Sequence, residues 1–352
     1  MIARILCLLL MVLTAPWSLA AEPRLDNRSI YLYQGPDRDQ QLVERAKKEG
    51  QLNFYSTMTL ADAQALTTAF EKKYGIKVNR WRSSDEKILL RAVTEARAGR
   101  HDTDVVEMNS NQVEVLYREK LLEEFYVPGI KDIPQHAIPK HRHYVPTRFA
   151  FFVMAYNTNL VKPADVPNNY DDVLNPKWIG KFGIEATDVL WFAALVRAMG
   201  EEKGMAYFQK LAAMKPDIRT SHILIAQLVA AGEIPMVLTA YNNNVETLKK
   251  KGGPIAWKPL QPAFGQSSSI ALAKHSTHPY ASLLFAQFAL SPEGQQIIKE
   301  MNRVPSSMAV DSPLNKFKYE LIDSTLALDE LDKWEAHWSR LFLGGNKVKK
   351  EE

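Results

Sequence analysis

Side chains with hydroxyl, amide or phenol groups follow several apolar runs of this sequence and could bind a small molecule through hydrogen bonds. They are Ser56, Thr57, Thr59, Ser83, Asn109, Tyr241 and Asn242. Together they offer many hydrogen-bond donors and acceptors but no obvious pair of nucleophile and base. The pattern therefore favours a site that holds a ligand over one that transforms it.

Asp188 and His222 are also predicted to bind the ligand, and as an alternative this carboxylate and imidazole could serve an exported hydrolase. Each stands at the predicted start of a helix, where a capping or surface role is common. The sequence contains no Gly-x-Ser-x-Gly, His-Glu-x-x-His, Walker or Gly-x-Gly-x-x-Gly motif, which lowers the expectation of an enzyme. His141 and His143 lack a third ligand at metal-binding spacing, so we predict surface loop histidines there.

The stretch from Gln51 to Trp81 must position the first of these polar residues. An apolar run ends at Ser56, as a buried strand does at its carboxyl end, and Thr59 with Asp62 forms a capping box that opens a helix. Gly75 supplies the left-handed stop of that helix, and a second strand follows. The predicted unit is a strand, a helix and a parallel strand, and such sheets bind small ligands outside the carboxyl ends of their strands.

Later segments repeat this arrangement and predict a second α/β region. A buried strand around Val105 precedes Asn109, and a strand from Ile234 to Thr239 leads to Tyr241. The run from Phe149 to Ala155 is the strongest apolar run after the amino-terminal segment and is typical of a central strand. Polar residues are therefore expected at strand ends in both regions.

Length and composition indicate a soluble protein with two domains. The chain has 352 residues, which is more than most single cores contain, with 46% hydrophobic and 24% charged residues. The formal net charge of +4 is too small and too dispersed to indicate binding to nucleic acid. Residues 22–36 lack periodicity, so we expect an exposed lead-in there.

Residues 1–20 are typical of a secretory signal peptide. Arg4 precedes an apolar run from Ile5 to Leu13, and Ser18-Leu19-Ala20 matches the small-x-small pattern before a cleavage site. The only cysteine, Cys7, lies inside this segment, so the mature chain has no thiol for a disulfide or a lipid anchor. No later apolar run is long enough to cross a bilayer, and we predict export to the periplasm.

Several short motifs occur in an order that is similar to a known family. They are Ala46-Lys47-Lys48-Glu49-Gly50-Gln51-Leu52, Tyr55-Ser56, Phe70-x-x-x-Tyr74-Gly75-Ile76-Lys77-Val78, Asn175-Pro176-Lys177-Trp178-x-Gly180-Lys181, Ala231-Gly232-Glu233-Ile234 and Ser291-Pro292-Glu293-Gly294-Gln295. The ordered set resembles the extracellular solute-binding proteins of the ferric-ion type, which are periplasmic receptors of ABC importers. The matches extend from about residue 42 to about residue 300.

The resemblance implies an α/β protein with the type 2 periplasmic binding protein fold, in which two α/β lobes are joined by two crossing strands. By position, the runs Phe149 to Ala155 and Phe264 to Ala273 are the expected crossings. Lobe 1 is then residues 22–147 plus 265–310, and lobe 2 is residues 148–264 plus 311–352. The lobes are expected to close on a ligand by a hinge, so that the membrane permease recognises the closed form.

The ferric-ion ligands of the family carry over poorly onto this chain. The resemblance implies two adjacent tyrosines at the position of Tyr241, and the second residue here is Asn242. It also implies a histidine and a carboxylate where this chain has Thr59 and Asn109. One phenolate among neutral groups is a poor cage for a hard cation, unless the carboxylate of Glu107 or Asp188 joins it.

We therefore predict that the protein binds a small polar organic solute or an anion in preference to bare ferric ion. If ferric ion is bound, Tyr241 is the residue expected to coordinate it. Arg148 favours an anion, whereas Asp188 beside Trp191 favours an ammonium group that also contacts the indole face, so the sign of the ligand's charge stays open. The predicted protein is a monomeric periplasmic receptor, not an enzyme. It needs no cofactor, binds no nucleic acid and delivers its solute to an ABC transporter permease.

Overall fold

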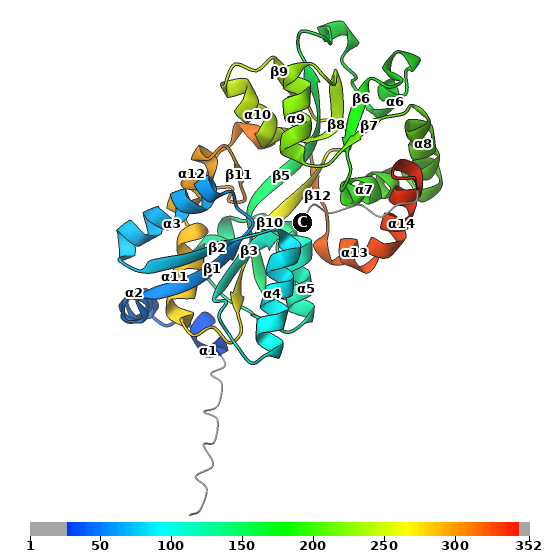
Figure 1. Cartoon of the computed structure of the whole chain (residues 1–352). Helices are drawn as coiled ribbons and strands as arrows, with labels where there is room; N and C mark the ends of the chain where they lie inside the picture. The colour runs from blue at the N-terminus through cyan, green and yellow to red at the C-terminus, as the bar shows by residue number, and fades with distance from the viewer. Residues whose placement is uncertain (1–26, 345–352) are drawn as a thin grey trace, which may run out of the picture.

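The computed structural model describes residues 27–344 and arranges them in two lobes, which Figure 1 shows one above the other. The strands are β1 (Gln51–Ser56), β2 (Lys77–Arg82), β3 (Val105–Asn109), β4 (Leu122–Glu123), β5 (Tyr144–Asn157), β6 (Phe182–Glu185), β7 (Asp217–Arg219), β8 (Met236–Tyr241), β9 (Ile255–Lys258), β10 (Phe264–Ala273), β11 (Val304–Pro305) and β12 (Glu320–Leu321). The main path of strand pairing is β2, β1, β3, β10, β5, β8, β6 and β7.

Helices cover this sheet in both lobes. They are α1 (Arg28–Tyr31), α2 (Arg38–Glu49), α3 (Leu60–Tyr74), α4 (Asp85–Arg97), α5 (Ser110–Arg118), α6 (Tyr170–Val173), α7 (Val189–Met199), α8 (Glu201–Ala213), α9 (His222–Ala231), α10 (Asn242–Lys250), α11 (Pro279–Ala289), α12 (Pro292–Glu300), α13 (Ser324–Asp329) and α14 (Leu331–Phe342). No helix within residues 27–344 has the length and apolar character needed to cross a membrane. The predicted signal peptide, residues 1–20, lies outside the described residues.

The first lobe begins with the predicted strand, helix and parallel strand, and this prediction is confirmed. β1 and β2 are parallel, with Leu52 opposite Val78. Between them, the hydroxyl oxygen of Thr59 caps α3 by accepting a hydrogen bond from the backbone N–H of Asp62 at 3.2 Å. The helix ends at Gly75, whose φ of 71° is a left-handed conformation that glycine adopts without steric strain.

Two further strands complete the sheet of the first lobe. β3 is parallel to β1, and β10 runs antiparallel to β3. On one face, Phe285 of α11 packs against Phe54 and Phe70 with ring centroids 4.9 and 5.1 Å apart. On the other face, Ile88 of α4 and Val113 of α5 belong to a second buried cluster. β1 therefore contributes buried side chains to both faces, with Phe54 in one cluster and Tyr55 in the other, whereas the edge strand β2 has exposed residues among its buried and half-buried ones.

β5 and β10 connect the two lobes. The first half of β5, from Tyr144 to Phe151, pairs with β10, and its second half pairs with β8 and β9 of the second lobe. The apolar runs at Phe149 to Ala155 and Phe264 to Ala273 lie in these two strands. The prediction of two lobes joined by crossing strands is confirmed.

The second lobe has its own parallel strands and an aromatic core. β6 is parallel to β8 and to β7. Phe192 of α7 packs against Trp334 and Trp338 of α14, with ring centroids 5.7 and 5.6 Å apart. The indole N–H of Trp338 also donates a hydrogen bond to the carbonyl of Ala186 at 2.7 Å. The last helix of the described chain is thus held against α7, as Figure 1 shows.

The expected exposed lead-in over residues 22–36 is wrong at two positions of its described part, although Ser29, Tyr33, Gln34 and Pro36 are exposed. Asn27, which precedes the short helix α1, and Tyr31, the last residue of α1, are fully buried. The amide of Asn27 donates to the carbonyl of Ser276 at 2.9 Å, and the hydroxyl of Tyr31 donates to the carbonyl of Ala273 at 3.1 Å. One amide and one phenol fix this segment to the first lobe, and two such residues form no periodic pattern.

The end of the described chain contacts both lobes. α13 packs on α5 of the first lobe, where Arg118 and Asp329 form an ion pair at 2.6 Å, whereas α14 packs on α7. We therefore propose that Ser324–Asp329 goes with the first lobe. We otherwise keep the predicted division, with lobe boundaries after residues 147, 264 and 310.

Candidate functional site

Glu107 organises the polar residues at the carboxyl end of the first lobe's sheet. It lies on β3 with 1% of its surface exposed and forms an ion pair with Arg148 of β5. Thr147 donates its hydroxyl to Oε1 at 3.0 Å, and Ser56 donates its hydroxyl to Oε2 at 3.0 Å. One carboxylate thus ties β1, β3 and β5 together. A buried charge needs such partners because its desolvation is otherwise strongly unfavourable.

Asp85, the first residue of α4, faces the end of β3. Its Oδ1 accepts a hydrogen bond from the backbone N–H of Asn109 at 3.0 Å, and its Oδ2 accepts one from the Asn109 amide at 2.9 Å. Burial raises the pKa of Asp85 to about 6, and the hydrogen bond from the Asn109 backbone opposes this rise. Sequence reasoning missed Asp85 as a site residue, although it stands just after Ser83 at a predicted helix start.

Thr57, Thr59 and Ser83 lie close to these groups at the ends of β1 and β2. The backbone N–H of Thr57 donates to the Glu107 carbonyl at 3.0 Å, and that of Ser83 donates to the Ser56 carbonyl at 3.3 Å. The hydroxyl of Thr59 is the cap of α3. The structure therefore brings together the polar residues predicted for the first lobe, which are Ser56, Thr57, Thr59, Ser83 and Asn109.

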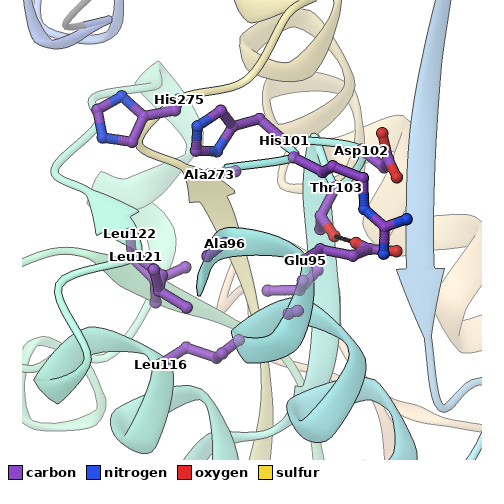
Figure 2. A pocket seen from close by; sticks show the side chains of 13 residues that line it. Glu95, Ala96, His101, Asp102, Thr103, Leu116, Leu121, Leu122, Ala273 and His275 are labelled. Carbon is purple, nitrogen blue, oxygen red and sulfur yellow. Dashed lines mark hydrogen bonds between the residues drawn. The ribbon is translucent and has the colours of Figure 1, made fainter. Parts of the chain in front are cut away.

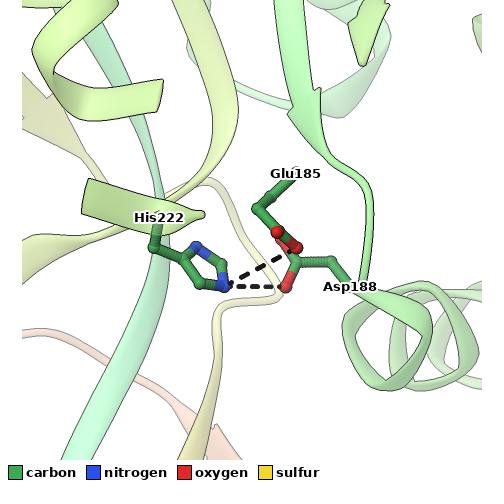
Figure 3. A group of neighbouring side chains, drawn as sticks. All are labelled: Glu185, Asp188 and His222. Atoms are coloured by element: carbon green, nitrogen blue, oxygen red, sulfur yellow. Dashed lines mark ion pairs between the residues drawn. The ribbon is translucent and has the colours of Figure 1, made fainter. Parts of the chain in front are cut away.

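Glu185, Asp188 and His222 form a cluster in the second lobe (Figure 3). Nε2 of His222 lies 3.1 Å from Oδ1 of Asp188 and 3.9 Å from Oε2 of Glu185. Glu185 ends β6, Asp188 directly precedes α7, and His222 is the first residue of α9. Glu185 and Asp188 have 1% and 4% of their surface exposed. Two carboxylates and one imidazole thus share a buried region.

The surrounding backbone fixes each member of this cluster. Oε2 of Glu185 accepts hydrogen bonds from the backbone N–H and the hydroxyl of Thr187, both at 2.6 Å. Its Oε1 accepts one from the backbone N–H of Ser221 at 2.8 Å. Ser221 has a φ of 84°, which is rare for a residue with a side chain, and this turn brings His222 to the cluster. Nδ1 of His222 donates to the Thr239 carbonyl at 2.9 Å.

The prediction that Asp188 and His222 have capping or surface roles is wrong. Asp188 occupies the cap position of α7 but its side chain makes no capping hydrogen bond, and Ser221 caps α9 in place of His222. Burial raises the pKa of Asp188 to about 6, and the nearby His222 opposes this rise. Burial alone lowers the pKa of His222, but the charge and hydrogen bond of Asp188 outweigh it, so the net shift is upward.

Tyr241 ends β8 and stacks on His222. The two ring centroids are 3.6 Å apart with an angle of 22° between the planes. The hydroxyl oxygen of Tyr241 accepts a hydrogen bond from the amide of Gln266 on the crossing strand β10. Burial, followed by the charges of Asp188, Glu185 and Asp85, raises the pKa of Tyr241 well above its ordinary value. Since Asp85 belongs to the first lobe, carboxylates of both lobes act on this phenol.

Asn242 and Trp191 have partners within the protein core. Asn242 is fully buried, and its amide donates to the Leu314 carbonyl at 2.7 Å. Trp191 is 1% exposed, and its indole N–H donates to the hydroxyl of Tyr170 at 3.4 Å. The expectation that Trp191 offers its indole face to a ligand is therefore wrong. The aromatic ring next to the cluster is that of Tyr241.

His222 does not form the nucleophile and base pair of a hydrolase in the described chain. Its nitrogen atoms contact the Thr239 carbonyl and the carboxylates of Asp188 and Glu185. Within residues 27–344, no serine or threonine hydroxyl forms a hydrogen bond with either nitrogen. A hydrolase of the Ser-His type requires that contact. The arrangement is better suited to binding a cation or a hydrogen-bond donor than to acyl transfer.

A separate pocket lies at the amino end of β3 (Figure 2). His101, Thr103, Leu116 and His275 are among its lining residues, and the two imidazole centroids are 4.9 Å apart. The pocket holds about 40 Å³, which is room for a few water molecules. The polar residues described above lie at the opposite, carboxyl end of β3. This pocket is therefore not part of the candidate site.

Residues 65–318 match the family model described as bacterial extracellular solute-binding protein. The Fe(3+)-binding periplasmic protein of Serratia marcescens is 24% identical to this chain over 256 residues, which cover 70% of this chain and 75% of that protein. The match by family model and the match to this relative agree on the class of protein.

Solved structures of periplasmic binding proteins have a similar fold. Iron-bound HitA from Pseudomonas aeruginosa is similar with a TM-score of 0.73 at 22% identity, covering 83% of this chain and 99% of that chain. AfuA from Actinobacillus pleuropneumoniae with bound fructose-6-phosphate gives a TM-score of 0.71 at 21% identity, covering 84% and 99%. One neighbour holds iron and the other a sugar phosphate, so the shared fold does not specify the ligand.

Proposed function

We propose that this chain, which belongs to the family of bacterial extracellular solute-binding proteins, is the periplasmic receptor of an ABC importer. As a monomer, it captures a small polar solute between its lobes by hinge closure and delivers it to the membrane permease. The observation that carries this proposal is the position of Tyr241 at the end of β8, where it stacks on His222 of its own lobe and accepts a hydrogen bond from Gln266 on the crossing strand β10. Strand ends of two lobes that face one region are a common ligand site.

The proposed solute is a small polar organic compound, in preference to bare ferric ion. Tyr241 is followed by Asn242, whose amide is engaged by the Leu314 carbonyl. Burial and nearby carboxylates keep the Tyr241 phenol neutral by raising its pKa, whereas ferric ion favours anionic oxygen ligands. AfuA, with fructose-6-phosphate bound, is an example of this fold with an organic solute.

The proposed solute carries no net negative charge. Arg148, which favoured an anion, is paired with Glu107. Without a bound cation, the other charged groups described at the site are the carboxylates of Asp85, Glu185 and Asp188, two of which share the imidazole of His222. The proposed contacts of the solute are Ser56, Thr57, Thr59, Ser83, Asn109, Asp188, His222 and Tyr241. Asn242 then has a supporting role through its hydrogen bond to Leu314.

Native mass spectrometry of protein purified from the periplasm without denaturation tests this proposal. We expect added mass from an organic compound, which denaturation releases and which rebinds chemically unchanged. Release of a compound altered by the protein would instead favour the hydrolase. Addition of ferric chloride should produce no visible tyrosinate colour, and a colour that disappears in Tyr241→Phe would overturn the choice of solute over iron.

A further inference from the structure

Two buried carboxylates in the second lobe share at most one positive charge. Glu185 and Asp188 both form ion pairs with His222, and within residues 27–344 neither forms one with a lysine or arginine. Buried carboxylates are strongly destabilised unless cations or hydrogen-bond donors balance them. Glu185 has backbone and hydroxyl donors from Thr187 and Ser221, but Asp188 has no comparable set. A divalent cation would balance both carboxylates.

Asp188 has a buried oxygen atom without a hydrogen bond of normal geometry in the described chain, although the side chain of Thr239 also acts on this carboxylate. Its Oδ2 is buried and has no hydrogen-bond partner, while its Oδ1 faces Nε2 of His222. Although Asp188 stands at the cap position of α7, it does not bind the helix backbone. Figure 3 shows its carboxylate directed at the carboxylate of Glu185. Two adjacent carboxylates repel each other, and a cation bound between them relieves this repulsion.

His222 is oriented as metal-binding histidines are. Its Nδ1 must carry the proton that it donates to the Thr239 carbonyl, because a carbonyl oxygen can only accept. Metal-ligating histidines commonly donate their other ring N–H to a backbone carbonyl in this way. In the neutral imidazole, Nε2 then presents a lone pair to the oxygens of Asp188 and Glu185. Three acceptors that face one another require a shared cation, either a proton or a metal ion.

The spacing of the donor atoms fits a transition metal. One donor atom from each of Glu185, Asp188 and His222 lies within 4.8 Å of the others. Donors about 2.1 Å from a zinc ion are about 3.1 Å apart at an angle of about 95°, and about 3.9 Å apart at about 135°. Donors at a tetrahedral angle around zinc are about 3.4 Å apart, and the observed separations from Nε2, 3.1 and 3.9 Å, lie on either side of this value. One imidazole and two carboxylates also suit zinc and manganese by ligand type.

We propose that Glu185, Asp188 and His222 bind a divalent transition-metal ion of the zinc class in the second lobe. The set includes none of the positions at which the family resemblance implies ferric-ion ligands. It leaves a coordination position for water or for a group of the solute, as zinc sites with three protein ligands do. The site lies within one lobe, and Asp188 and His222, which are proposed contacts of the solute, would then contact it through the metal ion.

Calorimetric titration of ZnCl₂ into tag-free, chelator-treated protein tests the site without any solute. The wild type should bind one zinc ion per chain, and Asp188→Asn and His222→Gln should each weaken binding at least about tenfold. Asp217→Asn is the matched control. It is the same substitution in the same lobe, but Asp217 is a half-exposed partner of Arg219, so zinc affinity should be unchanged. Circular dichroism and thermal unfolding establish that each variant is folded.

X-ray absorption at the zinc edge of the wild-type complex supplies a readout that does not depend on any variant. One imidazole with oxygen ligands should be seen, and His222→Gln should remove the imidazole signal. Failure of the wild type to bind either ZnCl₂ or MnCl₂, or equally tight binding by Asp188→Asn, would overturn the proposal. The shared cation of Asp188 and His222 is then a proton. Solute binding in native mass spectrometry is a separate measurement, so the proposed receptor function can hold or fail whether or not zinc binds.

Discussion

Substitution of Arg148 by methionine tests the ion pair that ties the first lobe to the crossing strand β5. The change keeps the aliphatic stem but leaves the Glu107 carboxylate, 1% exposed, without its cation. Loss of one partner from a buried pair lowers the free energy of unfolding by about 3–5 kcal/mol. Ser56 and Thr147 still donate hydrogen bonds to Glu107, so we expect a loss near the lower limit, about 3 kcal/mol.

Urea unfolding followed by circular dichroism measures this loss. With a slope of about 3 kcal/mol per molar urea, the midpoint should fall by about 1 M. Lys177→Met is the control, because Lys177 and Asp165 form an exposed ion pair whose side chains are 41% and 48% accessible. Loss of this ion pair should change the free energy of unfolding by less than about 1 kcal/mol.

The double variant Arg148→Met with Glu107→Gln removes both charges of the ion pair, so it distinguishes the cost of an unpaired charge from other effects of the Arg148 substitution. Because it removes the unpaired charge, it should recover part of the loss, about 1–2 kcal/mol. If Arg148→Met alone changes stability no more than Lys177→Met does, Glu107 does not depend on Arg148. The assignment of Glu107 as the residue that joins these strands would then be refuted.

Three further predictions concern the packing and the titration of particular residues. Trp338→Ala should lower the free energy of unfolding, measured in urea, by about 3–5 kcal/mol, because Trp338 is fully buried against α7. A loss below about 1 kcal/mol would contradict the contribution of α14 to the core of the second lobe. His278 donates a hydrogen bond to Asp104, and this contact raises the pKa of His278 above its ordinary value of about 6.5. The pair therefore stabilises the fold below about pH 6.5, and this stabilisation is lost as the pH rises through the raised pKa of His278. The stability advantage of the wild type over His278→Gln should therefore shrink between about pH 6 and pH 9, and a constant advantage would refute this. Burial raises the pKa of Asp85 to about 6, so the wild type should lose stability relative to Asp85→Asn as the pH rises from about 4 to about 7. A gain in relative stability over this pH range would show that Asp85 is not desolvated.

The elements that sequence reasoning predicted well are those with local signals. The strand to Ser56, the cap at Thr59 and the stop at Gly75 each depend on residues a few positions apart, and the structure has them at those places. The crossing strands were predictable because their apolar runs were long and because the family resemblance supplied the connectivity. Such patterns report on the backbone and on which face of an element is buried.

The arrangement of the second lobe's site was not predictable in the same way. Glu185, Asp188 and His222 lie on three different elements, and the contact between Asp188 and His222 spans a long stretch of chain. No periodic pattern encodes such a pair, so each residue alone resembled an ordinary helix start. The direction of the Asn242 side chain, toward Leu314, likewise depends on a contact from a distant segment.

Buried single residues explain the error at the amino end of the described chain. Tyr31 is fully buried against the first lobe although no apolar periodicity surrounds it. A short segment with one anchoring phenol has the composition of a loop and the burial of a core element. Sequence patterns average over several residues and do not detect it.

Hydrogen exchange measured by mass spectrometry, with and without the solute recovered from the purified protein, tests the central claim most directly. If the solute binds between the lobes, exchange should slow together at the end of β1, around Ser56 and Thr57, and at the end of β8, around Tyr241. These segments belong to different lobes and are joined through the crossing strands. Protection of both ends is the predicted result. Protection confined to one lobe would contradict capture of the solute by closure of the two.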